Sequence, residues 1–513
     1  MSTHHIEFLT IALGLVLLMA EAFLAPRDKR VLAWAAAAGL TAVLVLLPFT
    51  DATALPATGV APFYTADSYA LFFKGMALLT TIAVLILSAG YQPVLADGIN
   101  ADAKSSGGLA EYYCLPVFTC AGLMWMASAI DLVFLFVALE LVTISFYVMV
   151  ASMRRNTGSI EAGVKYLILG ALGTGLLVYG ISWIFGATGT TSLGELTGII
   201  AGQTTDQPAL LFGVLLVLCA LAFKVGVVPF HVWIPDVYQG APTPTTMFLS
   251  VGSKAAGVLV MMRFLAPFLA NEAIADKLVP LLVILTALTL LVGNLGAIGQ
   301  RNVKRLLAYS SIGHAGFLMI GITARDMRGV GFYLAAYLAM TIVAFAVLAL
   351  VRDETGGEDL THFDGLGKRS PFAAFALVIA MASLAGVPLT FGFLGKLRMF
   401  LDVVDSKQWL LVGTAMIAAS AGFYYYFKVI KHMYWHEPAD PRTFAFPKAT
   451  AAMVTLLVAA ILVFGIYPRP IANLLLPANT PAADLGTAAT GKNTGNDTGN
   501  QESLMPDRSQ SSP

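Results

Sequence analysis

Long apolar runs separated by short polar segments are the dominant pattern of this chain. A helix that crosses a bilayer needs about 20 apolar residues, and about 14 runs reach that length. They are 7–25, 31–49, 67–91, 111–130, 132–153, 161–185, 209–230, 243–267, 278–299, 303–323, 329–351, 371–402, 409–434 and 448–470. The pattern predicts an all-α polytopic membrane protein, and the N-terminal run, which lacks a basic segment before it, is expected to be a retained first span.

The short loops predict the orientation of these spans, because cytoplasmic loops are enriched in Lys and Arg. With the N-terminus outside, the inner loops carry fifteen such residues and the outer loops four. The inner set is Arg27, Lys29, Arg30, Lys104, Arg154, Arg155, Arg301, Lys304, Arg305, Arg352, Lys368, Arg369, Lys431, Arg442 and Lys448, and the outer set is Lys277, Arg325, Arg328 and Lys407. We therefore expect both termini to lie on the non-cytoplasmic side of the membrane.

Composition agrees with a membrane location and removes several classes of function. Of 513 residues, 58% are hydrophobic and 12% charged, against about 25% charged in soluble domains. Thirty basic residues balance thirty acidic ones, which disfavours a nucleic-acid-binding protein. No nucleotide-binding, haem or Fe–S motif is present, so no cofactor or metal is expected in this chain. Its energy must come from an ion gradient or from partner subunits.

The three cysteines, Cys114, Cys120 and Cys219, fall in or beside apolar runs with no CxxC motif and no Cys/His pairing. This spacing indicates ordinary packing rather than a zinc site or a disulfide framework.

The order of the spans predicts an internal duplication. Spans 4–8 and spans 9–13 each form a five-helix block whose fourth member holds a lysine beside a Pro/Gly break. Because five is odd, the two copies must be inverted relative to each other in the membrane. The predicted parts are a three-helix segment at 1–110, the two repeats at 111–267 and 278–434, a last span at 448–477, and a disordered polar tail at 478–513.

Ionisable residues within the spans are the main candidates for function, because a central Lys or Asp costs about 2.5–3.5 kcal/mol in membrane insertion. They are Glu140, Lys165, Lys224, Lys254 and Lys396. A buried lysine can release its proton near neutral pH, and a nearby carboxylate restores the charged form, so a Glu–Lys pair acts as a switch. With a single central carboxylate, a cage for a hard cation is improbable.

Snorkelling or a structural ion pair is the alternative for each of these residues. For Lys165, which lies near the inner face, this structural interpretation is a strong alternative to proton handling. For Lys74, near the start of span 3, it is the preferred interpretation. The depth of the other residues favours proton handling.

Two of the lysines lie beside predicted helix breaks. Lys224 precedes Pro229, and Lys396 follows the interior segment Gly386–Gly392, which contains Pro388. Broken backbone at membrane depth is tolerated only where protein or water satisfies it, and paired breaks in two halves point to an ion path. A plain proline kink is the alternative.

Span 10 adds one titratable histidine. Ser310 and His314 are four residues apart and share a helix face, which predicts a relay between the two lysine sites. A satisfied packing histidine is the alternative. His231 receives less weight, and His432 and His436 are expected to be ordinary loop or interface residues.

The sequence resembles the antiporter-like subunits of respiratory complex I (NADH:quinone oxidoreductase), a family that also includes subunits of multi-component Na+/H+ antiporters. The resemblance covers essentially spans 1–14 and excludes the tail. The segments that carry it are HVWIPDVYQGAPTPTTMFLSVGSK at 231–254, QRNVKRLLAYSSIGHAGF at 300–317 and LAGVPLTFGFLGK at 384–396. PDVYQGAPTP and the lysine at 396 look like subunit N rather than subunit M, and the end at span 14 disfavours subunit L.

The resemblance implies a role for most of the candidate residues. Glu140 and Lys165 match the coupling pair, Lys224 the central lysine of the broken helix, Lys254 the connecting lysine, Lys396 the lysine of the outward half-channel and His314 a relay position. The implied function is proton translocation driven by quinone reduction elsewhere in the complex. NADH, FMN, Fe–S clusters and quinone would be held by other subunits. Lys74 and the tail inherit no role.

Two other functions stay open at this point. The chain could belong to a multi-component Na+/H+ antiporter that is not coupled to redox chemistry, or it could be a structural spacer in the membrane.

Overall fold

The structure, a computed structural model, describes residues 2–475 except 24–28, 51–60, 100–107, 203–206 and 439. The predicted tail at 478–513 and the inner-loop residues Arg27 and Lys104 lie outside the described residues. The described part belongs to a single unit, Met1–Leu475. It is built of helices and isolated β-bridges, and no β-strand occurs in the described ranges.

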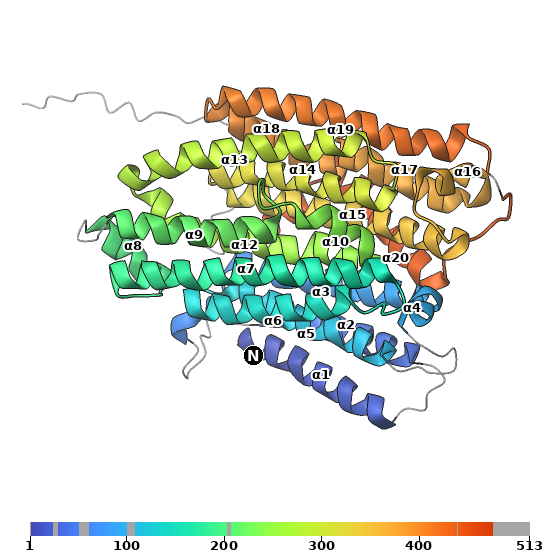
Figure 1. Ribbon diagram of the computed structural model, residues 1–513, viewed down its shortest axis with the longest axis horizontal. Helices are drawn as coiled ribbons and strands as arrows, with labels where there is room; N and C mark the ends of the chain where they lie inside the picture. Colours follow the sequence, from blue (N-terminus) through green and yellow to red (C-terminus); the bar gives the residue numbers. More distant parts are fainter. Residues whose placement is uncertain are drawn as a thin grey trace, which may run out of the picture. The chain divides into compact units, whose positions relative to one another are not determined.

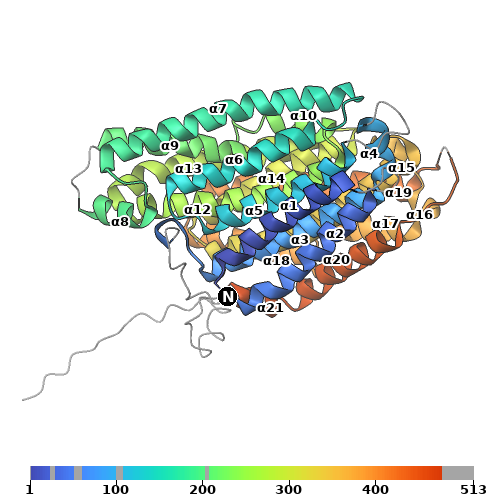
Figure 2. The same ribbon diagram turned by 90° about the horizontal axis from the view of Figure 1, so that it is seen from below.

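Most helices run side by side along one direction (Figures 1 and 2). In chain order the α-helices are α1 (His4–Phe23), α2 (Arg30–Leu46), α3 (Ser68–Gly90), α4 (Gln92–Ile99), α5 (Leu109–Ser128), α6 (Leu132–Val150), α7 (Thr157–Thr188), α8 (Leu193–Ala201), α9 (Gln207–Val225), α10 (Trp233–Gly240), α11 (Thr243–Phe248), α12 (Lys254–Ala270), α13 (Glu272–Ile298), α14 (Val303–Thr323), α15 (Met327–Thr355), α16 (Leu366–Arg369), α17 (Pro371–Ala385), α18 (Phe391–Asp405), α19 (Trp409–Trp435), α20 (Lys448–Ile466) and α21 (Arg469–Leu474).

Four short turns complete the helical elements. Three are 3₁₀ turns, η1 (Leu47–Phe49), η2 (Ala61–Phe63) and η4 (Leu360–Phe363), and η3 (Leu249–Ser253) is a single π-helical turn between α11 and α12.

The helices agree with the prediction of about 14 spans. Twelve helical segments of the described chain are long and apolar enough to cross a membrane. The remaining two predicted spans correspond to α5 and to the interrupted pair α17 and α18. One predicted span, 243–267, is a continuous run of α11, η3 and α12.

Polar side chains set where several spans begin. Asp131 separates spans 4 and 5, because its carboxylate accepts hydrogen bonds from the backbone amides of Val133 and Phe134 and so caps α6. Asp67 caps α3 in the same way, and Asn271 and Asn302 cap α13 and α14.

The centre of the bundle is formed by the helices that are buried on nearly all sides. In the most apolar 18-residue stretches of the α11–α12 segment, α14 and α15, 94%, 89% and 94% of the residues are buried. In those of α1 and α20, 28% are buried. α14 packs against α10, α13, α15, α18 and α19. A side chain on α14 can therefore contact both of the predicted repeats.

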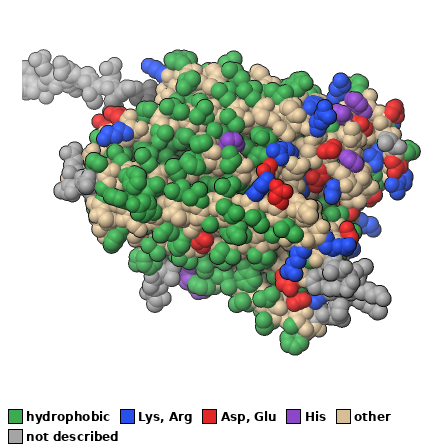
Figure 3. Space-filling view, in the orientation of Figure 1, with side chains coloured by type: hydrophobic (Ala, Val, Ile, Leu, Met, Phe, Trp, Pro, Cys, Tyr) green, Lys and Arg blue, Asp and Glu red, His purple; other side chains and the backbone are tan. Residues whose placement is uncertain are grey.

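The surface shows the division expected for a membrane protein. Hydrophobic side chains cover most of the face seen in Figure 3, and charged side chains gather mainly toward the end that carries α4 and α16. That end holds most of the predicted inner loops.

Both predicted helix breaks are present and have similar geometry. α9 ends at Val225 and α17 at Ala385, and each is followed by a glycine with positive φ, Gly226 at 87° and Gly386 at 91°. This left-handed conformation is readily adopted by glycine and is typical of helix C-termini. Pro229, which follows a cis peptide bond, and Pro388 lie in the irregular backbone beyond these glycines.

Candidate functional site

Four of the six predicted site residues are buried in the bundle. Lys224, Lys254, Lys396 and His314 have between 2% and 9% of their surface exposed. They come from α9, α12, α18 and α14 respectively. Buried ionisable groups are rare because burial disfavours charge, so their partners decide what each can do.

Lys224 lies in the last turn of α9, just before the first break. Its ammonium group donates a hydrogen bond to the Thr143 hydroxyl on α6. The freed backbone around the break has protein partners: the Trp233 indole donates to the Phe223 carbonyl at 3.0 Å, and the Val228 amide donates to the Thr289 hydroxyl at 3.0 Å. These bonds satisfy polar groups that a continuous helix would have paired.

Glu140 lies three residues before Thr143 on α6, so the two share a helix face. Its carboxylate accepts a hydrogen bond of 2.7 Å from the Thr174 hydroxyl on α7. Lys224 therefore approaches the face of α6 that carries Glu140, and it contacts Thr143 on that face directly.

Lys165 is only partly buried, with 43% of its side chain exposed, and it lies at a pocket of charged residues. Its ammonium nitrogen is 2.7 Å from Glu161 and 2.9 Å from Asp236, which also accepts a hydrogen bond from Arg305 at 2.9 Å. Within the described residues, no ion pair joins Lys165 to Glu140. The proposed coupling between those two residues stays a prediction.

The pocket beside Lys165 has a volume of about 450 Å³. Its charged lining comprises Glu161, Lys165, Asp236, Lys304, Arg305, Arg352 and Glu358. Lys304 forms a buried ion pair with Glu358 at 3.2 Å and donates to the Ala241 carbonyl at 2.6 Å. A polar pocket therefore lies beside Lys165 at the predicted inner end.

Lys254 is the first residue of α12, directly after the π-helical turn η3. Its ammonium group donates to both the backbone carbonyl and the hydroxyl of Ser311 on α14, the latter at 2.5 Å. The Tyr337 hydroxyl donates to the same Ser311 oxygen at 3.0 Å and is hydrogen-bonded to Ser250 at 2.7 Å. Single π-helical turns often occur at functional sites, and here the turn precedes a lysine held by a hydroxyl cluster.

His314 continues this polar cluster on α14. Its Nδ1 is 2.6 Å from the Tyr333 hydroxyl and its Nε2 is 3.1 Å from the Tyr426 hydroxyl. Tyr426 is in turn hydrogen-bonded to Ser310. Both ring nitrogens of His314 have hydroxyl partners, so a proton can be delivered at one nitrogen and removed at the other.

Lys396 caps the broken end of α17. Its ammonium group donates to the carbonyl oxygens of Leu384 and Ala385 at 2.7 and 3.1 Å, and it lies 4.9 Å from the centre of the Phe317 ring. The last carbonyls of a helix lack intrahelical partners and carry partial negative charge. The second break therefore provides acceptors for a charged lysine in place of a carboxylate.

A carboxylate group lies beyond Lys396 at the predicted outer end. Asp326, in the connection between α14 and α15, accepts a hydrogen bond of 2.7 Å from Arg398 on α18. Burial raises the pKa of Asp326, but the hydrogen bonds from Arg398 and from the Gly329 amide, together with the positive charge of Arg398, lower that pKa overall.

Lys74 has a partner that the sequence analysis missed. Its ammonium nitrogen is 2.8 Å from the carboxylate of Glu7 on α1, and both side chains are fully buried. The Tyr64 hydroxyl donates to Glu7 at 3.0 Å and accepts from Lys74 at 2.5 Å. The structure thus agrees with an ion pair for Lys74. Glu7 could have been found from its position one turn into the first span.

Comparison with known proteins identifies the family. The profile described as "NADH:quinone oxidoreductase/Mrp antiporter, TM" matches residues 129–422. NADH-quinone oxidoreductase subunit N of Desulforamulus reducens is 40% identical over 414 residues, covering 80% of this chain and 84% of the relative. The subunit N of Moorella thermoacetica is 37% identical over 475 residues, covering 91% and 96%.

This chain belongs to the NADH-quinone oxidoreductase subunit N family. The subunit N fold is also found in solved assemblies. A chain of respiratory complex I from Thermus thermophilus has a TM-score of 0.75 at 28% identity, covering 92% of this subunit N chain and 99% of that one. A chain of the Mrp complex of Dietzia sp. has a TM-score of 0.77 at 20% identity, covering 92% and 96%, which shows a shared fold.

Proposed function

We propose that this subunit N carries protons across the bacterial inner membrane as a part of NADH:quinone oxidoreductase, with both termini on the non-cytoplasmic side. The observation that carries the proposal is the succession of buried titratable residues from the first helix break to the second. Lys224, Lys254, His314 and Lys396 are all buried, and the first three each contact at least one hydroxyl group. The two breaks lie in the predicted repeats at 111–267 and 278–434.

Each residue has a stated part in the transfer. The pocket beside Lys165 admits the proton, Lys224 holds it at Nζ, and Lys254 receives it next. The Ser311 and Tyr337 hydroxyls connect Lys254 to the α14–α15 interface, where His314 binds the proton at one ring nitrogen and releases it from the other. Lys396 holds the proton last, against the free carbonyls of α17.

The driving force comes from redox chemistry in other subunits, where NADH, FMN, Fe–S clusters and quinone would be bound. Moving one charge against 100 mV requires about 2.3 kcal/mol. A change in the contacts of one charged pair is of that order. Displacement of Glu140 relative to Lys165 or Lys224 would change the proton affinity of Lys224 and so couple the two processes.

The experiment is proton pumping by the purified complex reconstituted into vesicles, with NADH oxidation measured in parallel. Lys224→Ala should abolish acidification while the complex still assembles, and Lys277→Ala, which changes an exposed lysine on α13, should leave acidification unchanged. Normal pumping by Lys224→Ala would overturn the proposal. Exchange of Na+ for H+ without any redox activity would assign the chain to an antiporter instead.

A further inference from the structure

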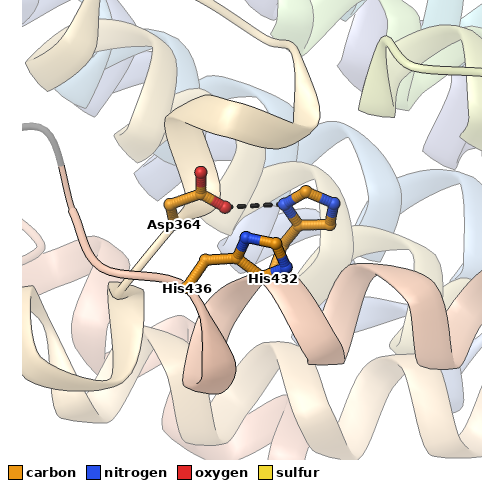
Figure 4. Close-up of side chains that lie close together, drawn as sticks. All are labelled: Asp364, His432 and His436. Carbon is orange, nitrogen blue, oxygen red and sulfur yellow. Dashed lines mark hydrogen bonds and ion pairs between the residues drawn. The ribbon is translucent and has the colours of Figure 1, made fainter.

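Two histidines and an aspartate lie together at the end of the bundle that carries α16. His432 is in the last turn of α19, and His436 is the first residue after that helix. Asp364 follows η4 in the connection between α15 and α17, far from both in sequence. Figure 4 shows the three side chains directed toward one another, with His432 Nδ1 2.6 Å from Asp364 Oδ1.

The arrangement brings one ligand atom from each residue close to the others. These atoms all lie within 4.8 Å of one another. The two imidazole rings are nearly parallel, with centroids 4.3 Å apart and an interplanar angle of 11°. His432 and His436 are four residues apart, at the last turn of α19 and directly after it, and this H-x-x-x-H spacing is the signal of the cluster in the sequence.

The backbone around the cluster is arranged for close approach. The Gly365 amide donates to the His432 carbonyl at 3.3 Å, which holds the segment of Asp364 against the end of α19. Gly365 has a φ of 65°, and a Cβ there would lie 2.5 Å from Pro438. A larger residue at this position would therefore require the backbone or Pro438 to shift.

We propose that Asp364, His432 and His436 bind a divalent transition-metal ion, Zn²⁺ above all, with water completing the coordination. Two imidazole nitrogens and one carboxylate oxygen are a donor set that suits Zn²⁺, which takes nitrogen and oxygen ligands at about 2.0–2.2 Å in tetrahedral geometry. Mg²⁺ and Ca²⁺ prefer all-oxygen ligands. Ligand atoms of a tetrahedral zinc site are about 3.3 Å apart, which follows from those bond lengths, so small side-chain rotations bring the present cluster into place.

The ion can reach this site from water. His436 is exposed, and the side chains of His432 and Asp364 are 19% and 16% exposed. Lys368, a basic residue on the same segment as Asp364, forms an ion pair with Glu437 at 2.8 Å. No step of proton transfer proposed above uses any of the three ligands.

Binding would link the end of α19 to the segment that leads into the second broken helix. Asp364 precedes α16 and α17, and the far end of α17 supplies the carbonyls that hold Lys396. His432 is on α19 and His436 directly follows it. α19 packs against α16 and α17. A bound Zn²⁺ would fix α19 to the start of the second broken helix and slow proton pumping, a consequence that rests on the proposed function.

The binding test uses the whole purified complex after treatment with a chelator. Equilibrium dialysis against radioactive ZnCl₂ should show one ion more on the wild-type complex than on His432→Ala or His436→Ala. His362→Ala, which removes a nearby histidine outside the cluster, should bind as the wild type does. Loss of one ligand is expected to weaken binding at least about 100-fold, since even supporting contacts alter metal affinity by about 10–100-fold. Equal zinc binding by wild type and both variants would overturn the site.

The pumping test separates the site from its consequence. Micromolar ZnCl₂ should slow acidification by wild-type vesicles, and the His432→Ala/His436→Ala complex should need at least about tenfold more for the same effect. Equal inhibition of both complexes would overturn the link between α17 and α19. Failure of the wild-type complex to pump at all would contradict the proposed function, and the dialysis result would still decide whether the metal site exists.

Discussion

Lys165 is joined to Asp236 across 2.9 Å, so that the first half of α7 is tied to the short helix α10 that follows the first break. Arg305, on α14, contacts the other oxygen of the same carboxylate. Asp236 therefore connects three helices, one of which carries His314. A change in its charge would alter the contacts of Lys165 and the helix break together.

Replacing Asp236 by Asn should slow proton pumping several-fold, because both Lys165 and Arg305 would lose a charged partner. Pumping and NADH oxidation measured on the same vesicles would check this. Glu161→Gln is the matched control, because Glu161 is also an ion-pair partner of Lys165 but is an exposed i,i+4 contact. Such contacts contribute only about 0.3–0.5 kcal/mol. If Glu161→Gln slowed pumping as much as Asp236→Asn, the special position of Asp236 would be refuted.

Lys396 should prove necessary for pumping through its proton and not only through its hydrogen bonds. Lys396→Arg retains donors for the Leu384 and Ala385 carbonyls, but an arginine does not release its proton. We expect an assembled complex with pumping lost. Lys396→Met should lose pumping and also destabilise the complex, since unpaired buried carbonyls cost about 1–3 kcal/mol. Native gel electrophoresis after heating would measure the difference in stability between the two variant complexes. Normal pumping by Lys396→Arg would show that this lysine does not carry the proton.

Two adjacent tyrosines offer a direct test of the His314 relay. Tyr426→Phe removes the hydroxyl that contacts both His314 and Ser310, and it should slow pumping substantially. Tyr425→Phe removes a hydroxyl that donates to Asn294 at 3.0 Å. It should cost about 1 kcal/mol of stability and leave the pumping rate unchanged. Equal pumping rates in the two variants would argue that His314 is a packing residue.

The Glu7–Lys74 pair should stabilise the position of α1. Lys74→Met leaves a buried carboxylate without its cation, at a cost of about 3–5 kcal/mol. The double variant Glu7→Gln/Lys74→Met removes both charges and should recover most of that stability. Thermal unfolding in detergent would provide the comparison. A double variant as unstable as Lys74→Met would show that the loss comes from packing and not from the unpaired charge.

The sequence was sufficient for the spans and the breaks, because both depend on local properties. The apolar runs and a cap such as Asp131 define helices, and proline with glycine defines the interruptions at Pro229 and Pro388. The burial of Lys224, Lys254 and Lys396 also followed from their depth in apolar runs.

The contacts between side chains could not be predicted in the same way. Asp236 and Lys165 are 71 residues apart, and Lys396 takes its partners from backbone carbonyls that have no sequence signature. Asp364 and His432 are 68 residues apart, so only the packing of α16 and α17 on α19 brings them together. Each of these contacts depends on tertiary structure, which one sequence read alone does not specify.

The π-helical turn at Leu249–Ser253 sets the direction in which Lys254 points. A π-turn is equivalent to one residue inserted into an α-helix, and each residue of an α-helix rotates the next side chain by about 100°. Deleting one residue from this turn would leave a span of sufficient length with its hydrophobic character intact. It would nevertheless rotate Lys254 relative to α11 and away from Ser311. The chain length between two fixed points, and not only the identity of the lysine, is thus part of what this membrane protein has to conserve.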